Sequence, residues 1–189
     1  MTADEYLREV LDAQTLGDNS DEVKALQKHR ADVEKLIRDN FKDTALTIRY
    51  AGSKAKGTMN KESYDLDIIS YISSGDNTAG DSLEDIYGNH KKALAKKYTV
   101  EPKGSALRLK GSNPEDIGVD FHIDVVPGRF TDETKTDAYL YQSGGDKQRL
   151  KTNLDVHLDH VRDSGLIDAI RLGKLWRVRN GLPIRTFVL

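Results

Sequence analysis

Residues 119–127 read Val-Asp-Phe-His-Ile-Asp-Val-Val-Pro, a stretch with the alternation of a half-buried β-strand. Asp120, His122 and Asp124 fall on one face of this strand, and the apolar residues between them fall on the other. A carboxylate flanked by Ile and Val is costly to bury unless a partner compensates its charge. We therefore expect Asp124 to belong to a functional site, with Asp120 as the competing candidate. Pro127 is expected to close the strand just after Asp124.

A second acidic motif, Asp65-Leu-Asp67, leads into an Ile-rich stretch that is typical of a buried strand over 66–72. Alternate residues share one face of a strand, so both carboxylates point the same way. Two such carboxylates repel each other by ~1 to 4 kcal/mol at close contact. Solvent at a strand end would relieve this repulsion, and so would a divalent cation. Oxygen-only ligands favour Mg²⁺ or Mn²⁺ over softer metals.

The two acidic stretches would act together if their strands were neighbours in one sheet. Asp65, Asp67 and Asp124 would then form a cluster of three carboxylates. Such a cluster can hold two Mg²⁺ (or Mn²⁺) ions ~3.5 to 4 Å apart, the arrangement that aligns an attacking hydroxyl with a nucleotide α-phosphate. We expect these three residues to be both metal ligands and catalytic residues.

A glycine-punctuated turn follows the strand expected over 46–50 and contains Gly52-Ser53 and Gly57-Thr58. Small residues at such a turn let backbone amides approach an anion, and the two hydroxyls can donate to phosphate oxygens. The segment is not a Walker A loop, because no Lys precedes the final hydroxyl. An ordinary turn between two elements is the alternative interpretation.

The remaining periodicity predicts blocks of helices on either side of a block of strands, which is typical of an α+β domain. A capping box at Thr2 begins a first helix, and a long amphipathic helix covers 21–41. The other expected elements are strands at 106–110 and 119–126, a helix over 81–98, a hairpin of 139–141 with 148–151, and helices from 154 onward.

Composition excludes several classes of protein. The chain has 189 residues, 37% hydrophobic and 32% charged, with a net charge of −2, so it has enough apolar material for a core and is not a bulk nucleic-acid coat. It contains no Cys, which excludes disulfide scaffolds and thiol nucleophiles. We expect a cytoplasmic protein without a membrane segment and without an obvious nucleic-acid-binding surface.

Four short motifs follow one another along the chain: Gly52-Ser53, Gly57-Thr58, Ser63-x-Asp65-x-Asp67 and Ile123-Asp124-Val-Val-Pro127. Together they resemble the DNA polymerase β-type nucleotidyltransferases. Within that superfamily the chain is similar to the oligoadenylate synthetase and cyclic GMP-AMP synthase branch, whose bacterial members are the SMODS-type CD-NTases. The segment 170–187 is similar to the branch's helical segment after the catalytic domain. There a Lys contacts the nucleotide triphosphate, which by position is Lys174, and Thr186 stands where members often carry a Ser near the nucleotide.

The resemblance implies a mixed β-sheet nucleotidyltransferase core with a long N-terminal helix and the start of a C-terminal helical domain. We place the catalytic core at 1–150 and the beginning of a truncated helical domain at 151–189. The implied substrates are nucleoside triphosphates, with Asp65 and Asp67 on both metal ions and Asp124 on the catalytic one. Gly52, Ser53, Thr58, Lys174 and Thr186 are the expected nucleotide-binding residues.

The implied activity is synthesis of a cyclic or linear oligonucleotide second messenger in bacterial anti-phage signalling, and it is compatible with a regulatory protein partner. One alternative is a transferase that tails RNA or adds AMP to a protein or small molecule. A second alternative is a catalytically silent nucleotide-binding module.

Overall fold

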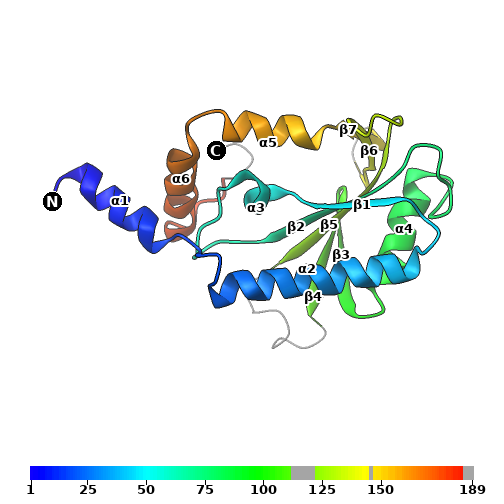
Figure 1. Ribbon diagram of the computed structural model, residues 1–189, viewed down its shortest axis with the longest axis horizontal. Coiled ribbons are helices and arrows are strands. Elements are labelled where there is room, and N and C mark those ends of the chain that lie inside the picture. Colours follow the sequence, from blue (N-terminus) through cyan, green and yellow to red (C-terminus); the bar gives the residue numbers. More distant parts are fainter. Residues whose placement is uncertain (112–121, 145–146, 185–189) are drawn as a thin grey trace.

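The computed structural model describes residues 1–111, 122–144 and 147–184. Within these residues the chain forms one mixed sheet with helices on both faces, so the α+β fold class is confirmed (Figure 1). The helices are α1 (Ala3–Ala13), α2 (Asp21–Asn40), α3 (Gly52–Lys56), α4 (Leu83–Leu94), α5 (Leu154–Arg162) and α6 (Ile167–Arg179). The strands are β1 (Leu46–Tyr50), β2 (Leu66–Ile72), β3 (Tyr98–Lys103), β4 (Ala106–Gly111), β5 (Ile123–Phe130), β6 (Ala138–Tyr141) and β7 (Arg149–Thr152).

The centre of the sheet is the parallel pair of β2 and β5. In the described residues the strand order is β1-β2-β5-β4-β3, and β6 pairs with both β5 and β7. Asp67 lies opposite Asp124 in the β2–β5 register, whereas the neighbouring β1–β2 and β4–β5 pairs are antiparallel. The two acidic stretches are therefore neighbours in one sheet, as expected from the sequence.

One face of the sheet carries the larger core, and α2 and α4 cover it. The buried residues of this core include Val33 and Ile37 of α2, Leu94 of α4, Leu66 and Ile68 of β2, and Ile123 and Val125 of β5. Side chains alternate along a strand, so Asp67 and Asp124 point to the opposite face. That opposite face holds a smaller cluster, formed by Ala51, Ile69, Tyr71, Phe130, Ala138 and Leu140.

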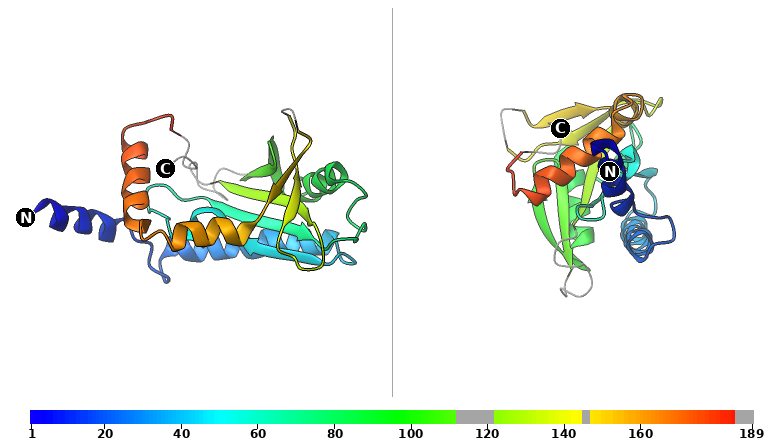
Figure 2. Two further views of the ribbon diagram at one scale, coloured as in Figure 1. Left: turned by 90° about the horizontal axis from the view of Figure 1, so that it is seen from above. Right: turned by 90° about the vertical axis from the view of Figure 1, so that its left-hand side faces the viewer.

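Helix α3 contacts both β2 and α5, and α6 stands at the end of the sheet where β2 and β5 begin (Figures 1 and 2). Arg49 of β1 pairs with Asp155 of α5, and the Arg162 guanidinium donates to the Ala55 carbonyl. Helix α1 contains no buried residue and extends away from the sheet beside α6 (Figure 2). None of the helices within the described ranges is long and apolar enough to cross a membrane.

Two local expectations about element type differ from the structure. The helix expected over 81–98 ends at Leu94, and strand β3 follows it. Strand β3 lies at the edge of the sheet, where a proline such as Pro102 is tolerated. Residues 52–56 of the glycine-punctuated turn form the short helix α3.

The expectation that Pro127 closes its strand was wrong. Strand β5 runs on to Phe130. Its pairing with β4 ends at Val125 and its pairing with β6 begins at Arg129, so Pro127 occupies the gap between two antiparallel neighbours. A proline is tolerated in that gap because no neighbour on that side needs its missing N–H.

Candidate active site

A row of charged residues crosses the sheet on the face opposite α2 and α4. Asp67 of β2 lies opposite Asp124 of β5, Asp124 lies opposite Arg108 of β4, and Arg108 lies opposite Glu101 of β3. Residues paired in register across strands project from the same face. We call this set the polar row. The strand register thus brings residues that are distant in sequence onto one face of the sheet.

Asp65 and Asp67 are carboxylates in an environment that disfavours their charge. Burial, together with the charges of Asp124 and Asp65, raises the pKa of Asp67 to about 6. Burial also raises the pKa of Asp65, and the nearby Asp124 carboxylate adds to that rise. The three carboxylates are therefore close enough to repel one another, and Lys174 and Lys56 offset only part of the repulsion at Asp67.

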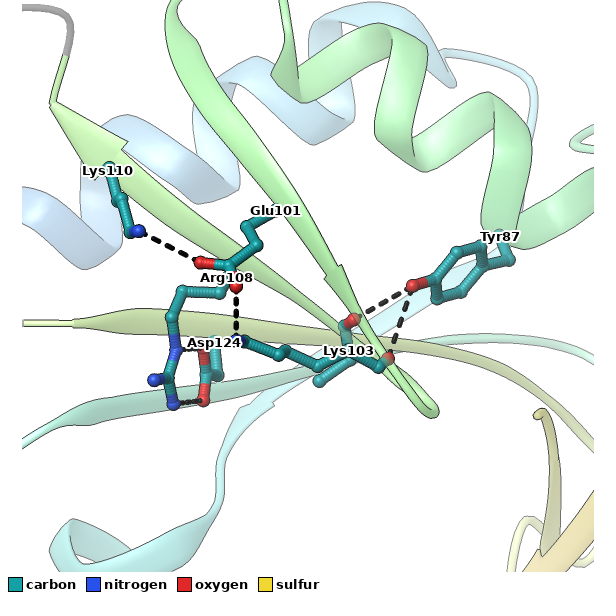
Figure 3. Close-up of polar contacts among 7 residues, drawn as sticks. Tyr87, Glu101, Lys103, Arg108, Lys110 and Asp124 are labelled. Carbon is teal, nitrogen blue, oxygen red and sulfur yellow. Dashed lines mark hydrogen bonds and ion pairs between the residues drawn. The ribbon is translucent and has the colours of Figure 1, made fainter. Parts of the chain in front are cut away.

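Asp124 is bound by Arg108 through both carboxylate oxygens (Figure 3). Arg108 Nε donates to Oδ1 at 2.9 Å and Nη2 donates to Oδ2 at 2.7 Å. Both side chains are largely buried, with exposed fractions of 26% for Arg108 and 16% for Asp124. A bidentate pair in a partly buried place is stronger than an exposed ion pair, because water screens it less.

Gly52 fixes how closely α3 approaches the acidic residues. Its φ is +55°, and a Cβ built on it would lie 1.6 Å from Oδ2 of Asp67. The neighbouring Ala51 N–H donates to the Asp67 carbonyl at 2.9 Å, so the start of α3 is fastened to β2. The glycine is required here for two reasons, the left-handed backbone and the absence of space for a side chain.

Lys174 of α6 brings a buried ammonium group to the same place. Its Nζ donates to the Thr58 carbonyl at 2.8 Å, and only 8% of the residue is exposed. Burial lowers the pKa of Lys174, while the charges of Asp65 and Asp67 raise it. The Lys174 ammonium is therefore held within electrostatic reach of both carboxylates. Thr58 itself is buried, and its N–H donates to the Ser53 carbonyl at 3.0 Å.

Two contacts on either side of Lys174 fasten α6 to the loop between α3 and β2. Buried Asn60 donates to the Arg171 carbonyl at 2.7 Å, and the Arg171 side chain reaches back to Asn60 Oδ1 at 3.3 Å. Farther along the helix, Arg179 donates to both oxygens of Glu62. Because Lys174 lies between Arg171 and Arg179, these contacts set its position relative to β2.

The three carboxylates, Arg108 and Lys174 line one cleft of about 700 Å³. The cleft brings together every predicted site residue that the structure describes: Gly52, Ser53, Thr58, Asp65, Asp67, Asp124 and Lys174. Thr186 and Asp120 lie outside the described residues. The placement is what the sequence motifs predict, while the chemical role of each residue stays a prediction.

Several residues of the cleft were not expected from the sequence to belong to the site. Arg108, Lys56, His157, His160 and Arg177 also line it. The Arg177 Nε is buried without a hydrogen-bond partner among the described residues. The sequence shows Arg177 only as one member of a basic helix face, and it shows Arg108 only as one residue of a strand. Their place in the cleft depends on strand order and helix docking, which no local motif encodes.

The donor set of the cleft fits a hard divalent cation. Asp65, Asp67 and Asp124 offer carboxylate oxygens, the preferred ligands of Mg²⁺ and Mn²⁺. The raised pKa of Asp67 marks negative charge that the surrounding residues do not fully compensate. In the arrangement described for 1–111, 122–144 and 147–184, no three acidic, His or Cys side chains are grouped as a ready-made metal site, and Asp124 is turned to Arg108.

We compared the sequence and the structure with those of known proteins. No protein-family model matches the chain, and no curated protein matches it. Among solved structures it resembles CdnC of E. coli MS115-1 in complex with HORMA-deltaN, at 21% identity and a TM-score of 0.63 over 97% of this chain and 60% of that one.

Two further solved structures show the same likeness. One is CdnE of Elizabethkingia meningoseptica, a cyclic dinucleotide synthase with GTP and Apcpp (16% identity, TM-score 0.62, over 86% of this chain and 64% of that one). The other is DncV of Vibrio cholerae, a cyclic AMP-GMP synthase in complex with the linear intermediate 5' pppA(3',5')pG (19%, 0.56, over 92% and 54%).

The sheet, the polar row and the cleft therefore define a protein with a nucleotidyltransferase-type α+β fold. More narrowly, the fold is that of the CD-NTases, and the resemblance read from the sequence motifs is confirmed at the level of fold. The chain spans between about half and two thirds of the length of the three structures named.

Proposed function

We propose that the chain is a metal-dependent nucleotidyltransferase that joins nucleoside triphosphates into a cyclic or linear oligonucleotide second messenger and releases pyrophosphate. The observation that carries the proposal is the cleft that gathers Asp65, Asp67 and Asp124 with Ser53 and Lys174. Likeness in fold to synthases of cyclic nucleotides supports it. A role in bacterial anti-phage signalling belongs to the same proposal and comes from the resemblance of the motifs.

Asp65, Asp67 and Asp124 are the proposed ligands of two Mg²⁺ or Mn²⁺ ions. Buried carboxylates that repel one another gain most from a divalent charge placed between them. Bound there, two ions would align the attacking hydroxyl with the α-phosphate and neutralise charge on the leaving pyrophosphate.

The reaction forms one phosphorus–oxygen bond and breaks another. The ribose hydroxyl of one nucleotide attacks the α-phosphorus of a second, and the bond to the β-phosphate oxygen breaks, so that pyrophosphate leaves with the electron pair. Asp124 accepts the proton of the hydroxyl and returns it to water. No nucleophilic side chain is needed, because positioning and charge neutralisation carry phosphoryl transfer.

Residues of α3, of the loop after it and of α6 are proposed to hold the triphosphate. Gly52 allows the backbone to come close, and the Ser53 and Thr58 hydroxyls serve as donors. Lys174 uses one N–H on the Thr58 carbonyl and keeps its others for phosphate oxygens. Thr186 stays a predicted nucleotide contact outside the described residues.

We further propose that 1–150 act as the catalytic core and that 151–189 begin a helical domain that contributes Lys174. The E. coli relative was solved with a HORMA protein, which supports a regulatory protein partner as part of the proposal.

The test is product formation from all four nucleoside triphosphates with Mg²⁺ or Mn²⁺, read as pyrophosphate release and as the mass of the product. Changing Asp65 and Asp67 to Ala is expected to abolish both signals. The charge-matched control changes Asp4 and Asp12 to Ala on the exposed helix α1, and it should retain activity. Activity that survives in the Asp65/Asp67 variant would remove the metal-dependent assignment. Label transferred to RNA or protein instead of a free oligonucleotide would favour the alternative transferases.

A further inference from the structure

Arg108 occupies a special place in the polar row, between two carboxylates. It lies opposite Asp124 on one neighbouring strand and opposite Glu101 on the other. Figure 3 shows its guanidinium on Asp124, while Glu101 is held by Lys103 and Lys110. Arg108 therefore pairs with Asp124, although Glu101 lies opposite it on the other neighbouring strand.

This pairing conflicts with metal binding at Asp124. Both oxygens of the carboxylate already accept hydrogen bonds from a full positive charge at 2.9 and 2.7 Å. A divalent cation binds carboxylate oxygens at about 2.0 to 2.1 Å and would be brought close to the guanidinium in a partly buried place, where repulsion is poorly screened. The guanidinium and the cation are alternative counter-charges for the same carboxylate.

We propose that Arg108 is a built-in competitor of the divalent cation: it neutralises Asp124 in the metal-free cleft and must release it when the cation binds. Metal binding and the release of Arg108 are then one coupled step. The inference concerns the same cleft as the proposed function and rests on it for the identity of the metal site. Arg108 is a positioning residue in this scheme, because it acts on the reaction through Asp124.

The polar row also provides a destination for the released side chain. Glu101 lies opposite Arg108 on β3, and its charge already acts on the guanidinium. The Glu101 carboxylate can accept Arg108 once Lys103 or Lys110 gives way, and both of these lysines are about half exposed. The exchange therefore requires side-chain rotation within one face of the sheet.

The test measures binding of Mn²⁺ alone, without nucleotide, by calorimetry and by electron paramagnetic resonance. Arg108→Gln is compared with Lys56→Gln, which removes the same charge from the same cleft but has no hydrogen bond to Asp124. Arg108→Gln is expected to bind Mn²⁺ about fivefold or more tightly than Lys56→Gln does. Arg108→Lys keeps the charge, loses the bidentate geometry, and should fall between wild type and Arg108→Gln.

Thermal unfolding supplies a second readout. Metal-free Arg108→Gln leaves Asp124 beside two other carboxylates without its partner, so its Tm should fall below that of wild type, and Mn²⁺ should raise its Tm by more than it raises that of wild type. Should Arg108→Gln fail to fold, the Arg108→Lys comparison decides. Equal Mn²⁺ affinity in Arg108→Gln and Lys56→Gln, or no Mn²⁺ binding in any variant, overturns the inference.

Pyrophosphate release measured on the same preparations separates this inference from the proposed function. If the wild type is active but Arg108→Gln does not gain Mn²⁺ affinity, the proposed role of Arg108 is overturned and the proposed function stands. A gain of affinity without any transferase activity supports the competition and counts against the proposed reaction.

Discussion

Gly52 shows how one residue controls the geometry of the cleft. Its missing side chain lets the Asp67 carboxylate lie against the start of α3, where a Cβ would come within 1.6 Å of an oxygen. Gly57 has a similar positive φ of 74°, yet a Cβ there would meet nothing within 4 Å. Gly52 therefore requires both the left-handed backbone and the absence of a side chain, whereas Gly57 requires only the left-handed backbone.

We predict that Gly52→Ala abolishes or strongly reduces activity and Mn²⁺ binding, because Asp67 must move to make room. Gly57→Ala carries only the backbone cost of about 1 kcal/mol and should remain active. Unfolding in urea and Mn²⁺ titration of both variants check this. A Gly52→Ala protein with wild-type Mn²⁺ affinity would show that the position of Asp67 does not matter.

Asp67 illustrates a functional residue that costs stability. Its folded-state pKa of about 6 lies above the ordinary value of 3.8, so its contribution to stability is greatest below pH 4 and is lost as pH rises through about 6. We predict that Asp67→Asn makes the metal-free protein more stable than wild type at pH 7, by about 1 to 3 kcal/mol, with little difference at pH 4.

Asp155→Asn is the contrasting control for that prediction. Asp155 pairs with Arg49, which holds the pKa of the carboxyl below its usual range, so removing its charge should leave stability unchanged or slightly reduced. Urea unfolding of both variants at the two pH values measures the difference. Loss of stability in Asp67→Asn at pH 7 would contradict the assignment of Asp67 as an uncompensated buried carboxylate.

The site could be predicted from sequence only where chemistry is local. Asp65 directly precedes β2 and Asp67 lies on it, and the small residues at 52–53 follow β1, so their spacing alone indicates a shared function. Arg108 carries no such signal, because its contact with Asp124 depends on the β4–β5 register across a long connection. Arg177 likewise enters the cleft only through the docking of α6.

At the scale of elements, strong periodicity gave correct helices and strands and weak patterns did not. Helix α2 and strand β2 have continuous apolar spacing, and both were predicted within a residue or so. Strand β3 was not predicted: the expected helix ended at residue 98 and the next expected strand began at residue 106. Glu101 and Pro102 interrupt the alternation of a strand, and the pairing with β4 forms β3. Pro127 looked like a strand end until the change of partner from β4 to β6 was known.

Helix α4 and strand β2 are joined through one buried histidine. His90 is fully buried, its Nδ1 donates to the Ile86 carbonyl at 2.8 Å, and its Nε2 accepts from the Ser70 hydroxyl at 3.0 Å. Its ring also stacks on Phe41, with centroids 4.5 Å apart. The neutral imidazole satisfies both contacts, and a protonated ring would leave the Ser70 hydroxyl without its acceptor.

We predict that this contact weakens in acid. Burial lowers the pKa of His90 to about 4, below its ordinary 6.5, so its share of stability is present above pH 6.5 and is lost as pH falls toward 4. The loss reaches about 3 kcal/mol at most. Urea unfolding of wild type and His90→Gln across this range tests it, and a pH dependence that the substitution leaves unchanged would disprove the role of His90.

At the scale of the whole molecule, we expect the backbone amides at the middle of the sheet to be the best protected against hydrogen exchange. Strand β2 lies between β1 and β5, and β5 has neighbours on both sides, while α1 buries none of its residues. Opening the central strands requires disruption of the main core, whereas α1 can open alone.

We predict that hydrogen exchange is slowest in β2 and β5 and fastest in α1. Exchange followed by mass spectrometry on peptides from 3–13, 66–72 and 123–130 measures the order directly. Protection of α1 equal to that of β2 would mean that α1 is held by contacts other than those described.

The parallel pairing of β2 with β5 has a consequence for how the molecule matures. The chain leaves β2, builds α4, β3 and β4, and only then returns to lay β5 alongside. Pairing strands that are so far apart in sequence is slow, because the chain loses the entropy of closing a long loop before the strand contacts form. Asp67 and Asp124 belong to opposite ends of that excursion. A partly folded chain therefore does not yet have Asp67 beside Asp124, and the candidate site forms only when β5 has paired with β2.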